Sequence, residues 1–251
     1  MKRGVKIGLI LIGAIVLIAL TIAANIVRSR SQVRGIDVSI RCNHSQQLVD
    51  EQTIIDSIIT SMPGIFTTRV CDLNRTQVAT IATKVPYIEE AIASVSVSGN
   101  VIVKAKQRRP IARVFYNDSE MYIDTYGAVF PTSNMADCDL LIINGDFSEP
   151  LNTDSLGSQM TDLLAVANFL DQNSNYSTLI DQLFCERDGD IMMVSKLGDN
   201  IIELGSASDL DEKFSNLLTF YKKGMPRAGW QTYNRISLKY KNQVVCSKIK
   251  Q

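Results

Sequence analysis

The chain has 251 residues, of which 45% are hydrophobic and 21% are charged, and its formal net charge is zero. This length is sufficient for a membrane segment followed by one large domain or two small ones. Because positive and negative charges balance, the composition shows no excess of basic residues that would attract DNA or RNA, so we expect no nucleic-acid partner. The cysteines show no paired spacing, so neither a zinc site nor a dense disulfide framework is indicated.

The N-terminal residues predict a transmembrane anchor at 7–27. This stretch contains no charged side chain and matches the roughly 20 residues that a helix needs to cross a bilayer. A stub of residues 1–6 precedes it and most of the chain follows it, so we expect a signal anchor that sends the C-terminal part outward. The alternative is a cleaved signal peptide, whose apolar region is usually only about 7–15 residues long.

Residues 36–105 predict a small module with the element order β-α-α-β-β. The segment "IDVSIR" alternates apolar and polar side chains, as a half-buried strand does. Asp50 can cap a helix that stops at Pro63-Gly64, and a second helix ends before Pro86. The stretch "AIASVSVSGNVIVKAKQ" then predicts two strands joined at Gly99-Asn100. We expect a three-stranded sheet with two helices on one face.

Residues 106–251 predict a mostly antiparallel β domain with packed helices. The strand patterns "ARVFYN", "EMYIDTYG", "AVFPTS" and "DLLIINGDF" are separated by Asn, Asp and Gly, as in a meandering antiparallel sheet. Apolar side chains at helical spacing predict two helices, one around Leu163 and one around Phe214. Further strand patterns lie between these helices in the sequence. Together with the preceding module, these elements predict the α+β class.

The sequence offers little for catalysis or cofactor binding. His44 is the only histidine, and it lies in a polar stretch without a nucleophile turn, which is typical of a solvated loop residue. Glu186, Asp188 and Asp190 lie close together, but an Asp-Gly turn accounts for them without a cation. No phosphate-binding loop, dinucleotide fingerprint or zinc-protease motif occurs. We therefore expect no enzyme activity, no cofactor, no metal and no small-molecule substrate.

Four short motifs follow one another along the chain. Pro86-Tyr87-Ile88 forms a Pro-aromatic-hydrophobic step, and Arg109-Pro110-Ile111-Ala112 forms a charged turn. The segment "YIDTYGAVFP" contains an Asp-x-x-Gly signature at Asp124 and Gly127, and "YNRISLKYKNQVV" closes the pattern. In this order and spacing the motifs resemble the FtsQ/DivIB family of bacterial cell-division proteins. In the terminal strand, Lys239 stands where that family usually has Arg.

The resemblance implies a non-catalytic scaffold of the divisome. It implies a cytoplasmic stub, one anchor in the cell inner (cytoplasmic) membrane, a POTRA domain at 36–105 and a β domain at 106–251. In that family the protein is single-pass and type II, with its C-terminal domains in the periplasm at the division septum. The implied partners are coiled-coil division proteins of the FtsB and FtsL type and other divisome subunits. Such a scaffold links early and late division proteins and helps control septal peptidoglycan synthesis.

The resemblance also implies where the partner binds, because in this family the last strand of the β domain accepts a strand from FtsB. Strand addition draws affinity from main-chain hydrogen bonds and specificity from alternate side chains. The candidate partner-binding residues are Lys239, Tyr240, Lys241, Asn242, Gln243, Val244 and Val245. Because the alternation of apolar side chains breaks after Tyr240, we expect a turn or bulge at Lys241-Asn242 and a terminal piece that is free to pair.

Two other classes of protein are consistent with the same pattern. A POTRA-containing accessory of protein secretion or outer-membrane assembly would also bind partners, but such proteins more often carry tandem modules. A periplasmic sensor or ligand-binding protein would need a pocket with a few convergent polar groups.

Overall fold

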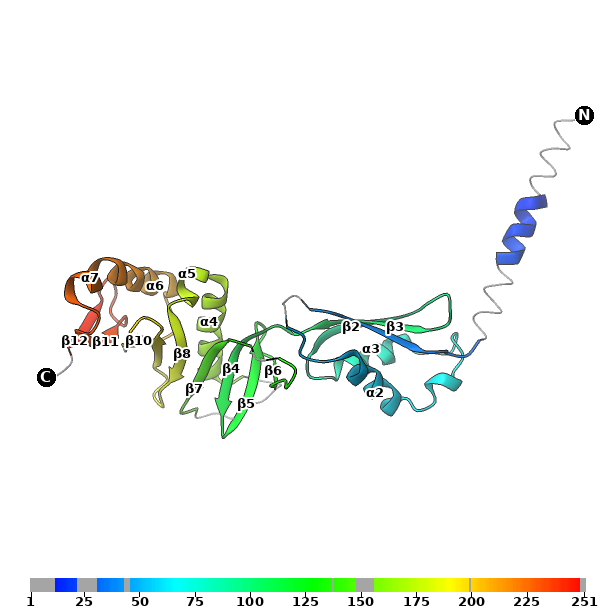
Figure 1. Ribbon diagram of the computed structural model, residues 1–251, viewed down its shortest axis with the longest axis horizontal. Helices are drawn as coiled ribbons and strands as arrows, with labels where there is room; N and C mark the ends of the chain where they lie inside the picture. Colours follow the sequence, from blue (N-terminus) through cyan, green and yellow to red (C-terminus); the bar gives the residue numbers. More distant parts are fainter. Residues whose placement is uncertain are drawn as a thin grey trace, which may run out of the picture. The chain divides into compact units, whose positions relative to one another are not determined.

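The computed structural model describes residues 12–21, 31–42, 46–136, 138–147, 156–198 and 200–248 (Figure 1). The chain divides after Arg108 into two compact units. Each unit has its own cluster of buried hydrophobic side chains and its own sheet. The fold is α+β, and both sheets are mixed, because each contains parallel and antiparallel pairs.

The prediction of a transmembrane anchor at 7–27 is wrong. Within the described part of the chain, no helix is long and apolar enough to cross a membrane. This finding also overturns the single-pass location in the inner membrane that rested on the anchor. The rest of the predicted anchor and the stub at 1–6 lie outside the described residues.

The first unit contains three strands and two longer helices. Its elements are β1 (Ile36–Arg41), α2 (Glu51–Ser61), the short 3₁₀ helix η1 (Ile65–Thr67), α3 (Arg75–Thr83), β2 (Ile88–Val95) and β3 (Val101–Gln107). The strand order is β1-β3-β2, in which β1 runs parallel and β2 antiparallel to the central β3.

Local sequence signals start both helices of the first unit. The Asp50 side chain accepts a hydrogen bond from the Thr53 N–H at 2.8 Å, and the Asn74 side chain accepts one from the Gln77 N–H at 3.1 Å. Such N-caps satisfy backbone donors that the first helical turn leaves unpaired. The buried faces of α2 and α3 pack in one cluster with alternate residues of β3; its fully buried members are Ile54, Ile58, Val78, Ala82, Ile88, Val101 and Val103.

The second unit is built on a nine-stranded sheet. Its strands are β4 (Pro110–Tyr116), β5 (Ser119–Asp124), β6 (Val129–Pro131), β7 (Leu141–Gly145), β8 (Ile180–Cys185), β9 (Ile191–Ser195), β10 (Ile201–Gly205), β11 (Tyr233–Ser237) and β12 (Val245–Lys248). Its helices are α4 (Ser158–Gln172), α5 (Ser174–Ser177), α6 (Leu210–Thr219), the π-helical turn η2 (Phe220–Gly224) and α7 (Met225–Ala228). The strand order is β12-β11-β10-β9-β8-β7-β4-β5-β6.

The predicted antiparallel meander is confirmed for β4, β5 and β6 but does not continue to β7. Five pairs of neighbouring strands in this sheet are antiparallel and three are parallel. β7 does not pair with β6 but lies beside β4, with Ile143 opposite Val114. β7 also runs parallel to β8, and β10 runs parallel to β11. Helices occur between the strands of both of these latter pairs, and a helical crossover is the usual connection between parallel neighbours. The helices that the sequence predicts are therefore crossovers in a mixed sheet.

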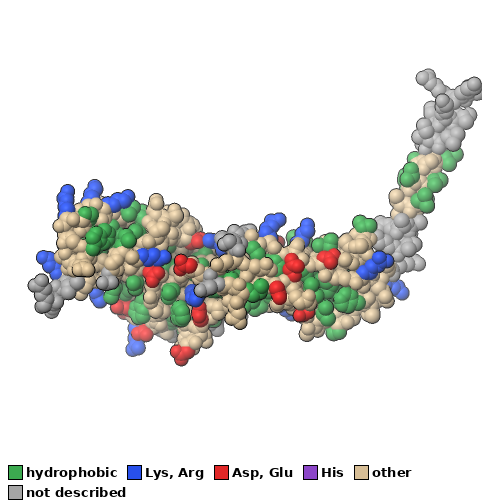
Figure 2. Space-filling view, in the orientation of Figure 1, with side chains coloured by type: hydrophobic (Ala, Val, Ile, Leu, Met, Phe, Trp, Pro, Cys, Tyr) green, Lys and Arg blue, Asp and Glu red, His purple; other side chains and the backbone are tan. Residues whose placement is uncertain are grey.

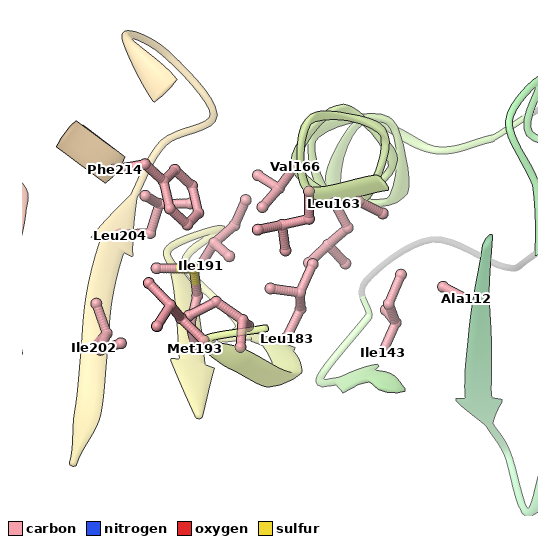
Figure 3. Packing of buried hydrophobic residues seen from close by; sticks show 14 of the residues in the cluster. Ala112, Ile143, Leu163, Val166, Leu183, Ile191, Met193, Ile202, Leu204 and Phe214 are labelled. Carbon is pink, nitrogen blue, oxygen red and sulfur yellow. The ribbon is translucent and has the colours of Figure 1, made fainter. Parts of the chain in front are cut away.

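The crossover helices cover one face of the sheet and form the core with it. Figure 3 shows Leu163 and Val166 of α4 above Leu183 of β8 and Ile191 of β9, with Phe214 of α6 nearby. All five side chains are fully buried. Each apolar side chain buried at this level contributes roughly 1.5–3 kcal/mol, so this layer secures the strands that lead to the C-terminal edge.

The Asp-x-x-Gly motif forms the turn between β5 and β6. The buried Asp124 accepts hydrogen bonds at Oδ1 from the backbone N–H groups of Tyr126 and Ala128, both at 2.9 Å. Gly127 has φ +86°, and a Cβ atom there would lie 2.6 Å from Leu156 Cδ1. Backbone geometry thus explains the motif, because the carboxylate closes the turn and only glycine fits beneath Leu156.

We predict that Gly127→Ala destabilises the second unit by at least about 1 kcal/mol more than Gly189→Ala. Both glycines have positive φ, so both variants bear the roughly 1–2 kcal/mol cost of a left-handed alanine. Only Gly127 adds crowding, since nothing lies within 4 Å of a Cβ at Gly189. Urea unfolding can be followed by the fluorescence of Trp230, the single tryptophan. Equal free energies of unfolding for the two variants would contradict this account.

Candidate partner-binding edge

The C-terminal strand β12 forms one edge of the nine-stranded sheet. Among the described residues it pairs only with β11, in antiparallel register with Ile236 opposite Cys246 and Ser237 opposite Val245. One side of its backbone therefore has no neighbouring strand. An edge strand of this kind presents N–H and C=O groups to which another strand can pair.

The predicted partner-binding residues lie at the start of this edge. Six of them, from Lys239 to Val244, belong to the connection between β11 and β12, and Val245 is the first residue of β12. The structure therefore places these residues in one local segment, most of it outside the strand itself. The strand residues Cys246, Ser247 and Lys248 extend the edge beyond the predicted set.

The connection reverses the chain at the position where the apolar alternation breaks. Asn242 has φ +57°, and the Gln243 N–H donates to the Tyr240 carbonyl at 3.2 Å. The Asn242 N–H also donates to Glu212 Oε1 of α6 at 3.0 Å. Asn adopts the left-handed conformation more readily than most residues. The turn that the sequence predicts at Lys241-Asn242 is therefore a left-handed reversal held by α6.

The side chains around the reversal differ in whether a partner protein could contact them. Lys239 forms an ion pair with Asp190, and this hydrogen bond raises the pKa of the lysine. Tyr240 is 57% exposed, while Leu238 before it is buried in the core. Lys241 is exposed. A partner can thus reach Tyr240 and Lys241, whereas Lys239 is already engaged within the domain.

Side chains of β12 alternate between the core and solvent. Val245 is 44% exposed, and Ser247 and Lys248 are also exposed. Cys246 packs against the core cluster, and burial raises the pKa of its thiol. β12 is therefore held to the domain by one side chain and by its pairing with β11.

Polar contacts attach β11 firmly to β10. Glu203 of β10 accepts a hydrogen bond at its carbonyl from the Leu238 N–H at 2.8 Å, and its carboxylate forms an ion pair with Arg235 at 2.5 Å. The Asn200 side-chain amide donates to the Tyr233 carbonyl at the other end of β11. Since β11 is held at both ends, β12 has a fixed strand to pair with.

A cavity of about 110 Å³ lies between the start of α6 and the β11–β12 connection. It is lined by Ser206, Ser208, Asp209, Glu212, Lys213, Asn216, Leu238, Lys239, Tyr240, Lys241 and Gln243. Of the lining residues, Lys213 donates a hydrogen bond from Nζ to the Ser206 carbonyl at 2.8 Å, and burial lowers the pKa of this lysine. Sites for small-molecule ligands usually have roughly 300–1,000 Å³, so this cavity has room for a single side chain.

Asp190 and Glu212 support the candidate edge through contacts that the sequence does not indicate. They hold Lys239 and Asn242, which lie 49 and 30 residues away in the chain. No periodic pattern links side chains at such separations, so no sequence signal identifies these contacts. Asp190 also closes the turn after β8, where the Glu186 N–H donates to the Asp190 carbonyl at 2.9 Å.

The other residues considered for chemistry are not gathered into a site. His44 lies outside the described residues. Within the described ranges, no group of three or more His, Cys, Asp or Glu side chains could hold a metal ion. The Glu186–Asp190 segment is a turn with Gly189 at φ +92°.

A family model described as FtsQ/DivIB, C-terminal related matches residues 109–247, which is more than half of the chain. The chain belongs to this family. The match begins where the second unit begins and includes the strand at the C-terminal edge. Membership of the FtsQ/DivIB-related family assigns the protein to cell division, and the family is in general non-catalytic. A search of curated proteins finds no match.

We predict that Asn242→Val lowers the stability of the second unit by about 1–2 kcal/mol, because a β-branched residue strongly disfavours positive φ. Asn242→Gly is the matched control, since it keeps the backbone N–H to Glu212 and permits the same conformation. Urea unfolding followed by Trp230 fluorescence compares the two. If the valine and glycine variants unfold at the same urea concentration, the left-handed turn does not constrain the edge.

Proposed function

We propose that this member of the FtsQ/DivIB-related family is a non-catalytic scaffold that binds another division protein by strand addition at β12. The observation that carries the proposal is the free edge of β12 within the region that the family model matches. The role in cell division comes from the family, and the mode of binding comes from the edge.

The edge lacks two of the features by which proteins protect a free strand, namely proline and an inward-pointing charge. Natural edges are usually interrupted by proline, by inward-pointing charges or by a covering helix or loop. β12 contains no proline, and its one charged residue, Lys248, is at its end. Val245, which is exposed, would instead offer an apolar contact to an added strand.

The chemistry of strand addition assigns different roles to the residues at this edge. The backbone of residues 245–248 supplies main-chain hydrogen bonds, which give affinity without reading sequence. Tyr240, Lys241 and the cavity beside them supply side-chain contacts at the start of the strand. The candidate residues from Lys239 to Val245 therefore tune specificity, and residues 246–248 complete the receiving strand.

The partners that we propose are the coiled-coil division proteins of the FtsB and FtsL type, which would connect this scaffold to other divisome subunits. In this role the protein links early and late division proteins and helps control septal peptidoglycan synthesis. The first unit has the β-α-α-β-β order of a POTRA module. We propose that it serves as a second docking module within the same machinery.

We predict that, of Cys246→Pro and Ser247→Pro, one abolishes capture of the FtsB-type protein and the other mainly weakens the fold. Neighbouring residues in a strand direct their N–H groups to opposite sides, and proline removes the donor. One variant therefore loses a bond to β11 and the other loses a bond to the added strand. The measurement is co-purification of the co-expressed FtsB-type protein from the same organism with each full-length variant.

The unfolding transition of each variant is the control for folding. Cys246→Ala and Ser247→Ala keep the backbone donors and should retain capture. If both proline variants remain folded and both still capture the FtsB-type protein, strand addition at β12 is excluded.

A further inference from the structure

The C-terminal part of the chain is basic throughout, although the whole chain has no net charge. After Glu212 the sequence contains no Asp or Glu. The basic residues in this part are Lys213, Lys222, Lys223, Arg227, Arg235, Lys239, Lys241, Lys248 and Lys250. Such an uneven distribution of charge gives one end of the domain a positive field that the overall composition does not reveal.

The helix that carries part of this charge contains a π-helical turn. α6, η2 and α7 follow one another without a break from Leu210 to Ala228, and the Met225 N–H donates to the Phe220 carbonyl. Gly224 makes room for this turn, since a Cβ atom there would lie 2.6 Å from Phe220 Cδ2. Turns of this type are rare and occur often at functional sites.

The π-helical turn directs its aromatic side chains toward the start of β11. The Phe220 ring lies 6.0 Å from that of Tyr233, and the Tyr221 ring lies 5.7 Å from that of Trp230. Tyr221 is buried, and its hydroxyl donates to Ser195 Oγ at 3.0 Å. These contacts fix the turn, so the lysines that follow the two aromatic residues are held on a rigid support.

Lys222, Lys223 and Arg227 form an exposed basic group on this support. Figure 2 shows Lys and Arg side chains gathered over the end of the domain that carries η2 and α7. Within the described part of the chain, no carboxylate lies within ion-pair distance of these three cations. By contrast, Arg235 and Lys239 in the same half of the domain are paired with Glu203 and Asp190.

The helix dipole accounts for only part of this charge. Cations in the last turn of a helix gain roughly 0.3–1 kcal/mol from the dipole, and the effect falls off within that turn. Arg227 lies in the last turn, but Lys222 and Lys223 precede it. Lys223 and Arg227 are four residues apart on this helix, a spacing at which like charges repel, so a negatively charged partner would relieve a cost.

Trp230 lies three residues after Arg227, packs against Tyr221 of η2 and is 41% exposed. It follows Gly229, whose φ of +92° turns the chain away from α7. Tryptophan and arginine are the residues most enriched among those that dominate binding energy at protein interfaces. A partly exposed indole that packs on the helix carrying these cations therefore combines an apolar anchor with charge recognition.

We propose that Lys222, Lys223, Arg227 and Trp230, named here the basic end surface, bind an acidic peptide segment of a partner protein. The acidic side chains pair with the three cations, and one apolar side chain of the segment packs on Trp230. Nucleic acids fit this surface less well, because they are held by longer rows of cations and by several stacked aromatic side chains. This recognition reads side chains and does not depend on strand addition.

The basic end surface adjoins the receiving edge. Lys248, the last residue of β12, lies opposite Tyr233 in the sheet, and Tyr233 contacts Phe220 of η2. A chain that leaves the edge at this end therefore passes Tyr233, which packs against the helix that carries the basic end surface. One partner can therefore occupy both sites if acidic residues flank its strand-forming segment.

The test uses Trp230 fluorescence of the full-length protein, because Trp230 is the only tryptophan. The probe is a synthetic glutamate-rich peptide with one central leucine, and the comparison peptide has lysine in place of glutamate. We expect a saturable shift of the emission with the acidic peptide, weakened by salt, and none with the basic peptide. The triple variant Lys222→Gln, Lys223→Gln, Arg227→Gln should bind the acidic peptide at least tenfold more weakly.

The matched control removes three exposed cations of the first unit, in the triple variant Arg41→Gln, Arg69→Gln, Lys104→Gln. It has the same net charge as the test variant and should bind the acidic peptide as tightly as the unmodified protein. Equal loss in both triple variants, or stronger binding of single-stranded DNA than of the acidic peptide, overturns the proposal. The Cys246→Pro and Ser247→Pro variants should keep the response to the peptide, so failure of strand addition is distinguishable from failure of this site.

Discussion

The parallel pairing of β10 with β11 is the interaction on which the C-terminal part of the structure depends. Ile202 lies opposite Ile236 and both are fully buried, while Glu203 holds β11 through its carbonyl and its carboxylate. The connection between these strands is the helix from α6 to α7, so the same crossover positions the helix and the strand. Without β11 in the sheet, β12 would have no strand to pair with.

Two chemically different surfaces meet at this end of the second unit. β12 presents backbone groups, which any extended segment of suitable shape can satisfy. The basic end surface presents side-chain charge and one indole, which select a partner by its composition. In the proposed mode of binding, main-chain pairing would supply affinity that is nearly independent of sequence, and charge at the basic end surface would restrict it to acidic partners. A scaffold that recruits particular division proteins needs both properties.

Local sequence patterns predicted the elements better than their arrangement. The caps at Asp50 and Asn74 begin α2 and α3, and the break after Tyr240 corresponds to the left-handed reversal at Asn242. The meander ends at β6 and was wrong for β7, because alternation within a strand does not say which strand lies beside it. The anchor was wrong because, among the residues that the structure describes, no helix is long and apolar enough to cross a membrane. The basic end surface was missed because composition was averaged over the whole chain.

The sequence by itself determined where helices and strands begin and end, which residues are apolar enough to be buried, and the family to which the second unit belongs. These properties depend on neighbours within a few residues or on the order of short motifs. Only the tertiary structure decided that β12 is an edge among the described strands, that Asp190 and Glu212 hold the reversal before it, and that Trp230 packs against Tyr221 of η2. Those relations join residues from separate crossovers, and no periodicity along the chain specifies them.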